Sequence, residues 1–167
     1  MTQTPLAYCQ VVTVAGELTV VVDPASEVVV AAGYEPVSRL LSRYAGSRSA
    51  EPLRQVPRAL AQAFAAYNAG QVHALDQITV RQGSTRFNRA VAKAMRQVTG
   101  TVSYGQLAAL AGYPGASRAV GTVCSHNPVA VIVPCHRVVR SDGSLGNYGY
   151  GTQIKLALLQ AEGALDT

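Results

Sequence analysis

The segment with the clearest chemical potential in this 167-residue chain is Ile-Val-Pro-Cys-His-Arg-Val-Val, residues 132–139. An apolar run leads into Pro134, which breaks regular structure and fixes the backbone just before Cys135. An unperturbed thiol has a pKa of about 8.5, so only a few per cent is thiolate at neutral pH. The imidazole of His136 can take the thiol proton, and the charge of Arg137 favours the anion. The pattern predicts a nucleophilic Cys135; the alternative is a buried, unreactive cysteine.

The other cysteines and histidines predict neither a disulfide framework nor a metal site. Cysteines stand at positions 9, 124 and 135, an odd number without any Cys-x-x-Cys spacing. The histidines at 73, 126 and 136 show no zinc-ligand spacing with them. We therefore expect free thiols and no bound metal.

Charge is distributed unevenly along the chain. Residues 1–80 carry five Arg against six acidic residues, a net charge of −1, whereas residues 81–167 carry nine Lys or Arg against three, a net charge of +6. The C-terminal half is therefore the half expected to meet a polyanion, although a solvated basic surface is the simpler alternative. No run of 18 apolar residues and no secretory signal is evident, so we expect no membrane segment and a cytoplasmic location.

The elements that must position Cys135 fall into two groups. Three strands over 8–14, 18–22 and 27–32 predict an antiparallel meander, followed by helices over 37–44 and 57–67 and a strand over 75–80. Residues 45–52 are expected to form a loop. Gln-Gly-Ser at 82–84 marks a boundary, which predicts an N-terminal α/β domain over 1–81 and a second domain over 82–167. The second domain begins with a helix over 87–97.

A helix-turn-helix is predicted within the basic half. Residues 103–112 begin with a capping Ser103 and end with Gly112. After the turn Tyr-Pro-Gly, a second helix over 116–125 consists of small residues and carries Arg118 near its start. The small side chains would allow this helix to approach a groove wall closely. Two packed helices without any DNA contact are the alternative.

Several of these segments together resemble the O6-alkylguanine-DNA alkyltransferase family. Residues 134–138, Pro-Cys-His-Arg-Val, are similar to its active-site pentapeptide. The first motif helix from Thr101 and the start of the recognition helix, Arg-Ala-Val-Gly at 118–121, are similar as well. Further similar positions, in the same order, are Asn127-Pro128, Gly146-Asn147-Tyr148-Gly149, Lys155, Leu158-Leu159 and Glu162-Gly163. The resemblance runs from about Phe87 to Gly163.

The resemblance implies a fold of the α+β or α/β class. A small N-terminal sheet-plus-helix domain, ribonuclease H-like, would be followed by a mainly helical, winged-helix-like domain. That second domain would contain the helix-turn-helix and carry Cys135.

The resemblance also implies a reaction that consumes the protein. Cys135 would attack the alkyl carbon on O6 of guanine, or on O4 of thymine, and keep the alkyl group as a stable thioether without any cofactor. His136 would act through a water as the base, Glu162 would orient His136, and Asn127 would brace the turn before the active-site segment.

The implied partner is double-stranded DNA that contains O6-alkylguanine, bound by a monomer that can be cooperative on DNA. The target base would be flipped out of the stack from the minor groove. Arg118 would fill the gap and Tyr104 would crowd the phosphate. The remaining implied contacts are Ser117, Ala119 and Thr122 with DNA, and Pro134, Val138, Tyr148, Gly149 and Tyr150 around the flipped base.

Tyr150 distinguishes this chain from family members that have glycine at that position. Its ring is expected to narrow the pocket and to disfavour bulky adducts such as benzyl. The alternatives to alkyl transfer are a helix-turn-helix transcription regulator, an alkyltransferase-like lesion sensor that does not react, and a cysteine hydrolase.

Overall fold

The computed structural model describes residues 4–46 and 48–165. Clustering of contacts divides the chain into two compact units. Unit 1 comprises Met1–Arg81 together with Pro128–Ile132, and unit 2 comprises Gln82–Asn127 together with Val133–Thr167. None of the described helices is long and apolar enough to cross a membrane.

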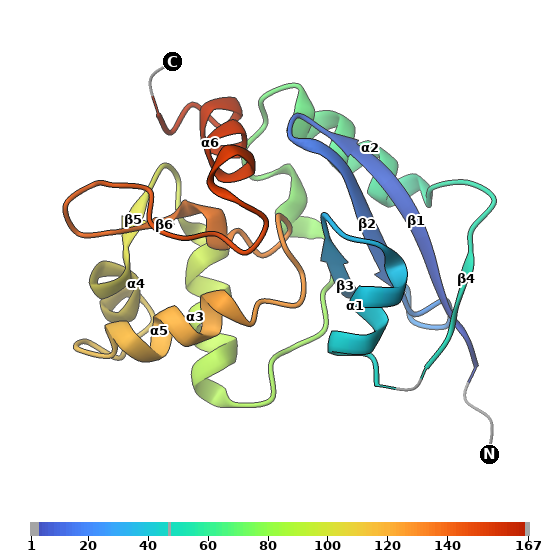
Figure 1. Ribbon diagram of the computed structural model, residues 1–167, viewed down its shortest axis with the longest axis horizontal. Helices are drawn as coiled ribbons and strands as arrows, with labels where there is room; N and C mark the ends of the chain where they lie inside the picture. The colour runs from blue at the N-terminus through green and yellow to red at the C-terminus, as the bar shows by residue number, and fades with distance from the viewer. Residues whose placement is uncertain (1–3, 47, 166–167) are drawn as a thin grey trace. The chain divides into compact units, whose positions relative to one another are not determined.

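Unit 1 is built on a four-stranded sheet in the order β3-β2-β1-β4 (Figure 1). Strands β1 (Leu6–Thr13), β2 (Gly16–Val22) and β3 (Val29–Gly33) form the expected antiparallel meander. The helices are α1 (Val37–Tyr44), which packs on β2 and β3 through Leu40, and α2 (Arg58–Asn68), which packs on β1.

Two sequence predictions in unit 1 are wrong. Residues 45–52 were expected to form a loop, but β4 (Ala50–Pro52) pairs in parallel with β1. Three residues are too few for an alternating pattern to be visible, so only pairing with β1 defines this strand. The strand expected over 75–80 is instead a 3-10 helix, η1 (Ala74–Gln77), and Val80 alone bridges to Val29.

The outer edge of β3 is covered by two short parallel bridges. One comes from residues near Val80, and the other comes from Pro128–Ile132. Ala32 donates its N–H to the carbonyl of Pro128 at 2.9 Å and accepts the N–H of Ala130 at 3.0 Å. The chain segment that leads to Cys135 is therefore fixed on the edge of the N-terminal sheet.

Val131, within that segment, has a strained backbone. Its φ is +72°, which is rare for a β-branched residue, and Ile132 N–H bonds to the Ala130 carbonyl across it at 2.9 Å. This is a classic γ-turn, a strained conformation expected to cost about 1–3 kcal/mol. The strain persists for two reasons. The hydrogen bond to Ala32 holds Ala130, the residue before Val131, and close packing holds the buried Val131 side chain.

Unit 2 is mainly helical. It contains α3 (Arg86–Gln97), the helix-turn-helix pair α4 (Tyr104–Leu110) and α5 (Ser117–Ser125), and α6 (Thr152–Ala161). A two-stranded parallel sheet joins β5 (Val102–Ser103) to β6 (Val138–Val139). The mixed α and β class predicted from the sequence is confirmed in both units, while the ribonuclease H-like label stays a prediction.

Side-chain caps explain where α3 and α4 begin. The Thr85 hydroxyl caps α3 by accepting the N–H of Asn88 at 3.0 Å. Ser103 and Gln106 form a reciprocal capping box at the start of α4, with bonds of 3.1 and 2.9 Å. These caps satisfy backbone donors that have no partner within the helix.

Candidate active site

Cys135 opens a one-turn 3-10 helix, η2 (Cys135–Arg137), directly after Pro134. Pro134 has φ −86° and ψ 67°, and Cys135 N–H bonds to the Val133 carbonyl at 2.9 Å. This is an inverse γ-turn, which the proline ring favours because it restricts φ to near this value. The turn and the first residue of β6 bracket η2, so the backbone of Cys135 is fixed on both sides.

Asn127 connects the end of α5 to the thiol. Its side-chain amide donates to the Val133 carbonyl at 2.7 Å and lies 3.2 Å from Cys135 Sγ. Its backbone N–H donates to the Cys124 carbonyl at 3.3 Å. One side chain therefore holds the γ-turn and the sulfur relative to the end of α5.

Burial raises the pKa of the Cys135 thiol, and this effect outweighs the hydrogen bond from Asn127 and the charge of Lys155, which both lower it. The resting residue is therefore a neutral thiol, and a base must remove its proton before it can react. The expected role of Arg137 in favouring the anion is not seen, because its guanidinium is engaged elsewhere.

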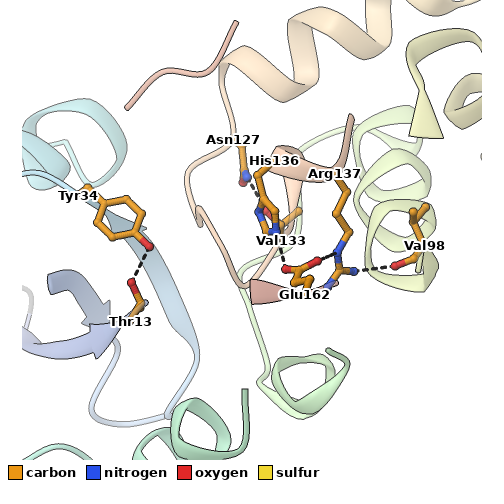
Figure 2. Close-up of polar contacts among 8 residues, drawn as sticks. All are labelled: Thr13, Tyr34, Val98, Asn127, Val133, His136, Arg137 and Glu162. Atoms are coloured by element: carbon orange, nitrogen blue, oxygen red, sulfur yellow. Dashed lines mark hydrogen bonds and ion pairs between the residues drawn. The ribbon is translucent and has the colours of Figure 1, made fainter. Parts of the chain in front are cut away.

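A single carboxylate organises the residues that follow Cys135. Glu162, the C-cap of α6, lies between His136 and Arg137, as Figure 2 shows. Its Oε2 is 2.6 Å from His136 Nε2, and its Oε1 accepts from Arg137 Nε at 2.7 Å. The three side chains are 0%, 3% and 1% exposed for His136, Arg137 and Glu162 respectively.

The protonation state of this cluster follows from its contacts. Burial would raise the pKa of Glu162, but hydrogen bonds from His136 and Arg137 and the charge of Arg137 lower it to about 2. Burial lowers the pKa of His136 despite the neighbouring carboxylate. A neutral imidazole beside an ionised carboxylate carries its proton on Nε2, which leaves the Nδ1 lone pair as a base. Within the described part of the chain, Nδ1 is buried and has no hydrogen-bond partner.

Arg137 connects this cluster to α3, a connection that sequence reasoning missed. Besides binding Glu162, its guanidinium donates to the carbonyl of Val98, the C-cap of α3, at 2.8 Å. The sequence did contain a signal for this contact. Arg137 stands next to the apolar pair at 138–139, which predicts burial, and a buried cation needs an anion as its partner.

Lys155 is a second cation that was not among the predicted site residues. It is 1% exposed, and its Nζ donates to the carbonyls of Val138 at 2.7 Å and Asn147 at 3.3 Å. It therefore joins β6 to the loop that precedes Tyr148. Its spacing with 158, 159 and 162 places it on the buried face of α6, and this spacing is the signal that could have identified it.

The predicted DNA-contact residues gather on the helix-turn-helix. Arg118, Ala119 and Thr122 are exposed on α5, Ser117 is half-buried at its start, and Tyr104 opens α4. A Cβ added at Gly121 would lie 3.9 Å from the Tyr104 ring, so the ring packs across the small face of α5.

The predicted base-contact residues lie on both sides of β6. Pro134 and Val138 are buried, and Gly149 is exposed between two tyrosines. The rings of Tyr148 and Tyr150 meet edge to face, with centroids 6.0 Å apart and planes at 67°. Among the described residues, no group of three or more His, Cys, Asp or Glu side chains could hold a metal ion.

Comparison with known proteins identifies the family. Residues 86–164 match the family model described as the DNA-binding domain of 6-O-methylguanine DNA methyltransferase. The structure resembles that of Mycobacterium tuberculosis OGT in complex with DNA, with a TM-score of 0.73 and 30% identity over 95% of this chain and 93% of that one. The chain belongs to the methylated-DNA–protein-cysteine methyltransferase family.

Two sequence relatives carry that family's name. The protein of Salmonella typhimurium is 42% identical over 111 residues, 65% of each chain. The protein of Mycolicibacterium paratuberculosis is 43% identical over 111 residues, 64% of this chain and 67% of the relative. The alignment thus spans about two thirds of their length. All the candidate residues from Tyr104 to Glu162 fall within the segment that matches the methyltransferase family model.

The shared carboxylate predicts an acid-sensitive fold. A Glu162 pKa that drops from 4.5 to about 2 on folding corresponds to about 3 kcal/mol of stability, present above pH 4.5 and lost as the pH falls toward 2. Glu162→Gln has no group to titrate, so its unfolding free energy should fall less over that interval. Urea unfolding at several pH values between 5 and 2 would measure this. Parallel curves for the two proteins would contradict it.

The contact between Asn127 and the sulfur predicts a change in thiol reactivity. Because this hydrogen bond lowers the pKa of the Cys135 thiol, Asn127→Ala should move the pH profile of Cys135 alkylation by iodoacetamide to higher pH. Mass spectrometry of peptides would separate Cys135 from the other thiols. Ser125→Ala, which removes a nearby hydrogen bond to Thr122 without touching the sulfur, is the matched control and should leave the profile in place.

Proposed function

We propose that this protein repairs DNA directly, by accepting the alkyl group from O6 of guanine onto Sγ of its own Cys135. The observation that carries the proposal is the 2.6 Å contact between His136 and Glu162, one residue after a thiol held by Asn127. A thiol, a base and a group that orients the base form the arrangement that nucleophilic catalysis requires. The family membership of the chain and the DNA in the solved relative's complex support the substrate.

The proposed chemistry balances without any cofactor. The Cys135 proton passes through a water to His136 Nδ1, and the imidazolium is stabilised by the ionised Glu162. The thiolate then attacks the alkyl carbon, a C–S bond forms, and the C–O6 bond breaks with its electron pair leaving on guanine. The His136 imidazolium returns its proton through water to the departing guanine, so the net products are guanine and S-alkylcysteine and the imidazole is neutral again. Because a thiolate is a poor leaving group from an alkyl carbon, the C–S bond persists and each molecule reacts once.

The same site explains why a neutral resting thiol is useful. Burial keeps Cys135 protonated until a base is in place, which protects it from other electrophiles. A bound substrate that displaces water would also strengthen each electrostatic contact in the site.

The alkylated atom lies inside a stacked duplex, so we propose that the nucleotide is flipped into the site through the minor groove. The exposed small residues Ala119 and Thr122 would let α5 approach the groove, and Arg118 would occupy the space left in the stack. Tyr104 would press against the backbone phosphate. Tyr148, Val138, Pro134 and Gly149 would surround the base, with alkylated thymine as a second substrate.

Two other classes of function, DNA binding without reaction and hydrolysis, predict different outcomes. A helix-turn-helix regulator or an unreactive lesion sensor would bind DNA without changing Cys135. A cysteine hydrolase would turn over repeatedly on an ester or amide. Neither class of function requires both the contact between His136 and Glu162 and a segment that matches the family's DNA-binding domain.

The decisive test is transfer of a labelled methyl group from O6-methylguanine in duplex DNA. We expect one label per protein molecule, found on Cys135 by mass spectrometry, and none in Cys135→Ala. Cys124→Ala is the matched control and should still accept the label, since burial holds the pKa of that thiol at about 12. Label elsewhere, or repeated turnover, would overturn the proposal.

Tyr150 predicts the tolerance for large adducts. Its ring packs on the edge of Tyr148, where a benzyl group on the flipped base would need room. Tyr150→Gly should therefore speed the reaction of Cys135 with free O6-benzylguanine by about tenfold or more, the scale at which pockets discriminate by shape. Tyr150→Phe retains the ring and should react like the parent protein. Equal inhibitor sensitivity of all three proteins would refute this role.

A further inference from the structure

Helix α3 carries a row of positive charge that the proposed chemistry does not use. Arg86, Arg89, Lys93 and Arg96, here called the basic stripe, lie on α3, and the first three are exposed. At 3.6 residues per turn the four side chains fall within an arc of roughly 80° and extend over about 15 Å. The buried residues Val91, Ala94 and Met95 occupy the other side of the helix.

The stripe has little negative charge near it in the sequence. Residues 82–101 contain no Asp or Glu. In the described part of unit 2 the acidic residues are Asp142, which is exposed, and Glu162, which is buried and bound to His136 and Arg137. Among the described residues, Arg86, Arg89 and Lys93 form no ion pair.

The three exposed cations of the stripe, Arg86, Arg89 and Lys93, do not serve the stability of their own helix. Arg86 and Arg89 lie at the start of α3, where the helix dipole disfavours cations and where no acidic residue compensates. Arg89 and Lys93, four residues apart, repel each other. The Arg89 guanidinium donates a hydrogen bond to the carbonyl of Gly83 at 3.0 Å, which a neutral donor could also make. Charges that disfavour the helix and bury nothing point to an external anion.

We propose that the basic stripe binds the phosphate backbone of the duplex that the helix-turn-helix holds, outside the lesion. Helix α3 packs against both α4 and α5, so the stripe belongs to the same compact unit as the recognition helix. Its length of about 15 Å matches roughly four base-pair steps of duplex. The contact is electrostatic and independent of base sequence.

This inference rests on the proposed function but adds a measurable property, the number of phosphates engaged. Each phosphate neutralised by a cation contributes about 0.9 to the slope of log affinity against log salt. Loss of three cations of the stripe should therefore reduce that slope by about 2 to 3. The loss should be the same for damaged and undamaged duplex.

The experiment compares two charge-matched triple variants of the full chain, both in a Cys135→Ser background that cannot react. One is Arg86→Gln, Arg89→Gln, Lys93→Gln, and the control is Arg39→Gln, Arg54→Gln, Arg58→Gln, three exposed arginines of unit 1. Affinity for a duplex of about 25 base pairs is measured between about 0.05 and 0.3 M salt. Thermal unfolding checks that both variants fold.

The stripe variant is expected to bind more than tenfold more weakly at about 0.1 M salt, with the reduced slope, while the control retains the parent slope. Its unfolding midpoint should equal or exceed that of the parent, because repulsion within α3 is relieved. An unchanged slope, or equal losses in both variants, would overturn the proposal. The proposal would also be overturned if the stripe variant retained its DNA binding while an acidic protein displaced DNA from the parent but not from the variant. That result would assign the stripe to a protein partner instead. If the protein with Cys135 intact failed to transfer methyl groups, the proposed function would fail while the salt slope of the Cys135→Ser proteins still tested the stripe.

Discussion

The helical unit that carries Cys135 depends on one buried carboxylate, that of Glu162. It binds the imidazole N–H of His136 and the guanidinium of Arg137. Glu162 is almost inaccessible to water, so its charge must be compensated within the protein. His136 and Arg137 provide that compensation, and Arg137 in turn binds the end of α3 at Val98. The carboxylate thereby connects the C-terminus of α6, the turn after Cys135 and the first helix of the unit. The contacts that hold the fold here are the same contacts that orient His136, the base of the proposed reaction.

The position of the nucleophile depends on backbone geometry on its other side. Two γ-turns, at Val131 and Pro134, lead into Cys135, and the first of them is strained. Bonds to Ala32 hold the chain just before the strained turn, and Asn127 holds the carbonyl of Val133 just before Pro134. Ala32 of unit 1 therefore fixes the segment Pro128–Ile132, from which the chain continues through Val133 and Pro134 to Cys135.

The electrostatics of the site favour uncharged, unreactive forms of Cys135 and His136 in the absence of substrate. Burial raises the pKa of Cys135 and lowers that of His136, so the resting pair is a neutral thiol and a neutral imidazole. Asn127 and Lys155 lower the pKa of the Cys135 thiol, but their combined effect is smaller than that of burial. In the proposed reaction, which would consume the protein, a neutral resting thiol would limit loss of the nucleophile to other electrophiles before an alkyl carbon is in place.

The sequence by itself determined the features that are local. The turn residues and caps predicted the meander, the helices on either side of Gln82 and the helix-turn-helix, and the order of residue types from 134 to 138 predicted a nucleophile with a neighbouring base. Only the tertiary structure decided the rest. Strand β4 exists because β1 pairs with it, and the segment expected as a strand at 75–80 became η1. The guanidinium of Arg137 binds the buried carboxylate of Glu162, which lies 25 residues away in sequence, and it therefore does not stabilise a Cys135 thiolate. Such partners come from distant positions, and burial, which sets each pKa, is a property of the packed chain and not of any short segment.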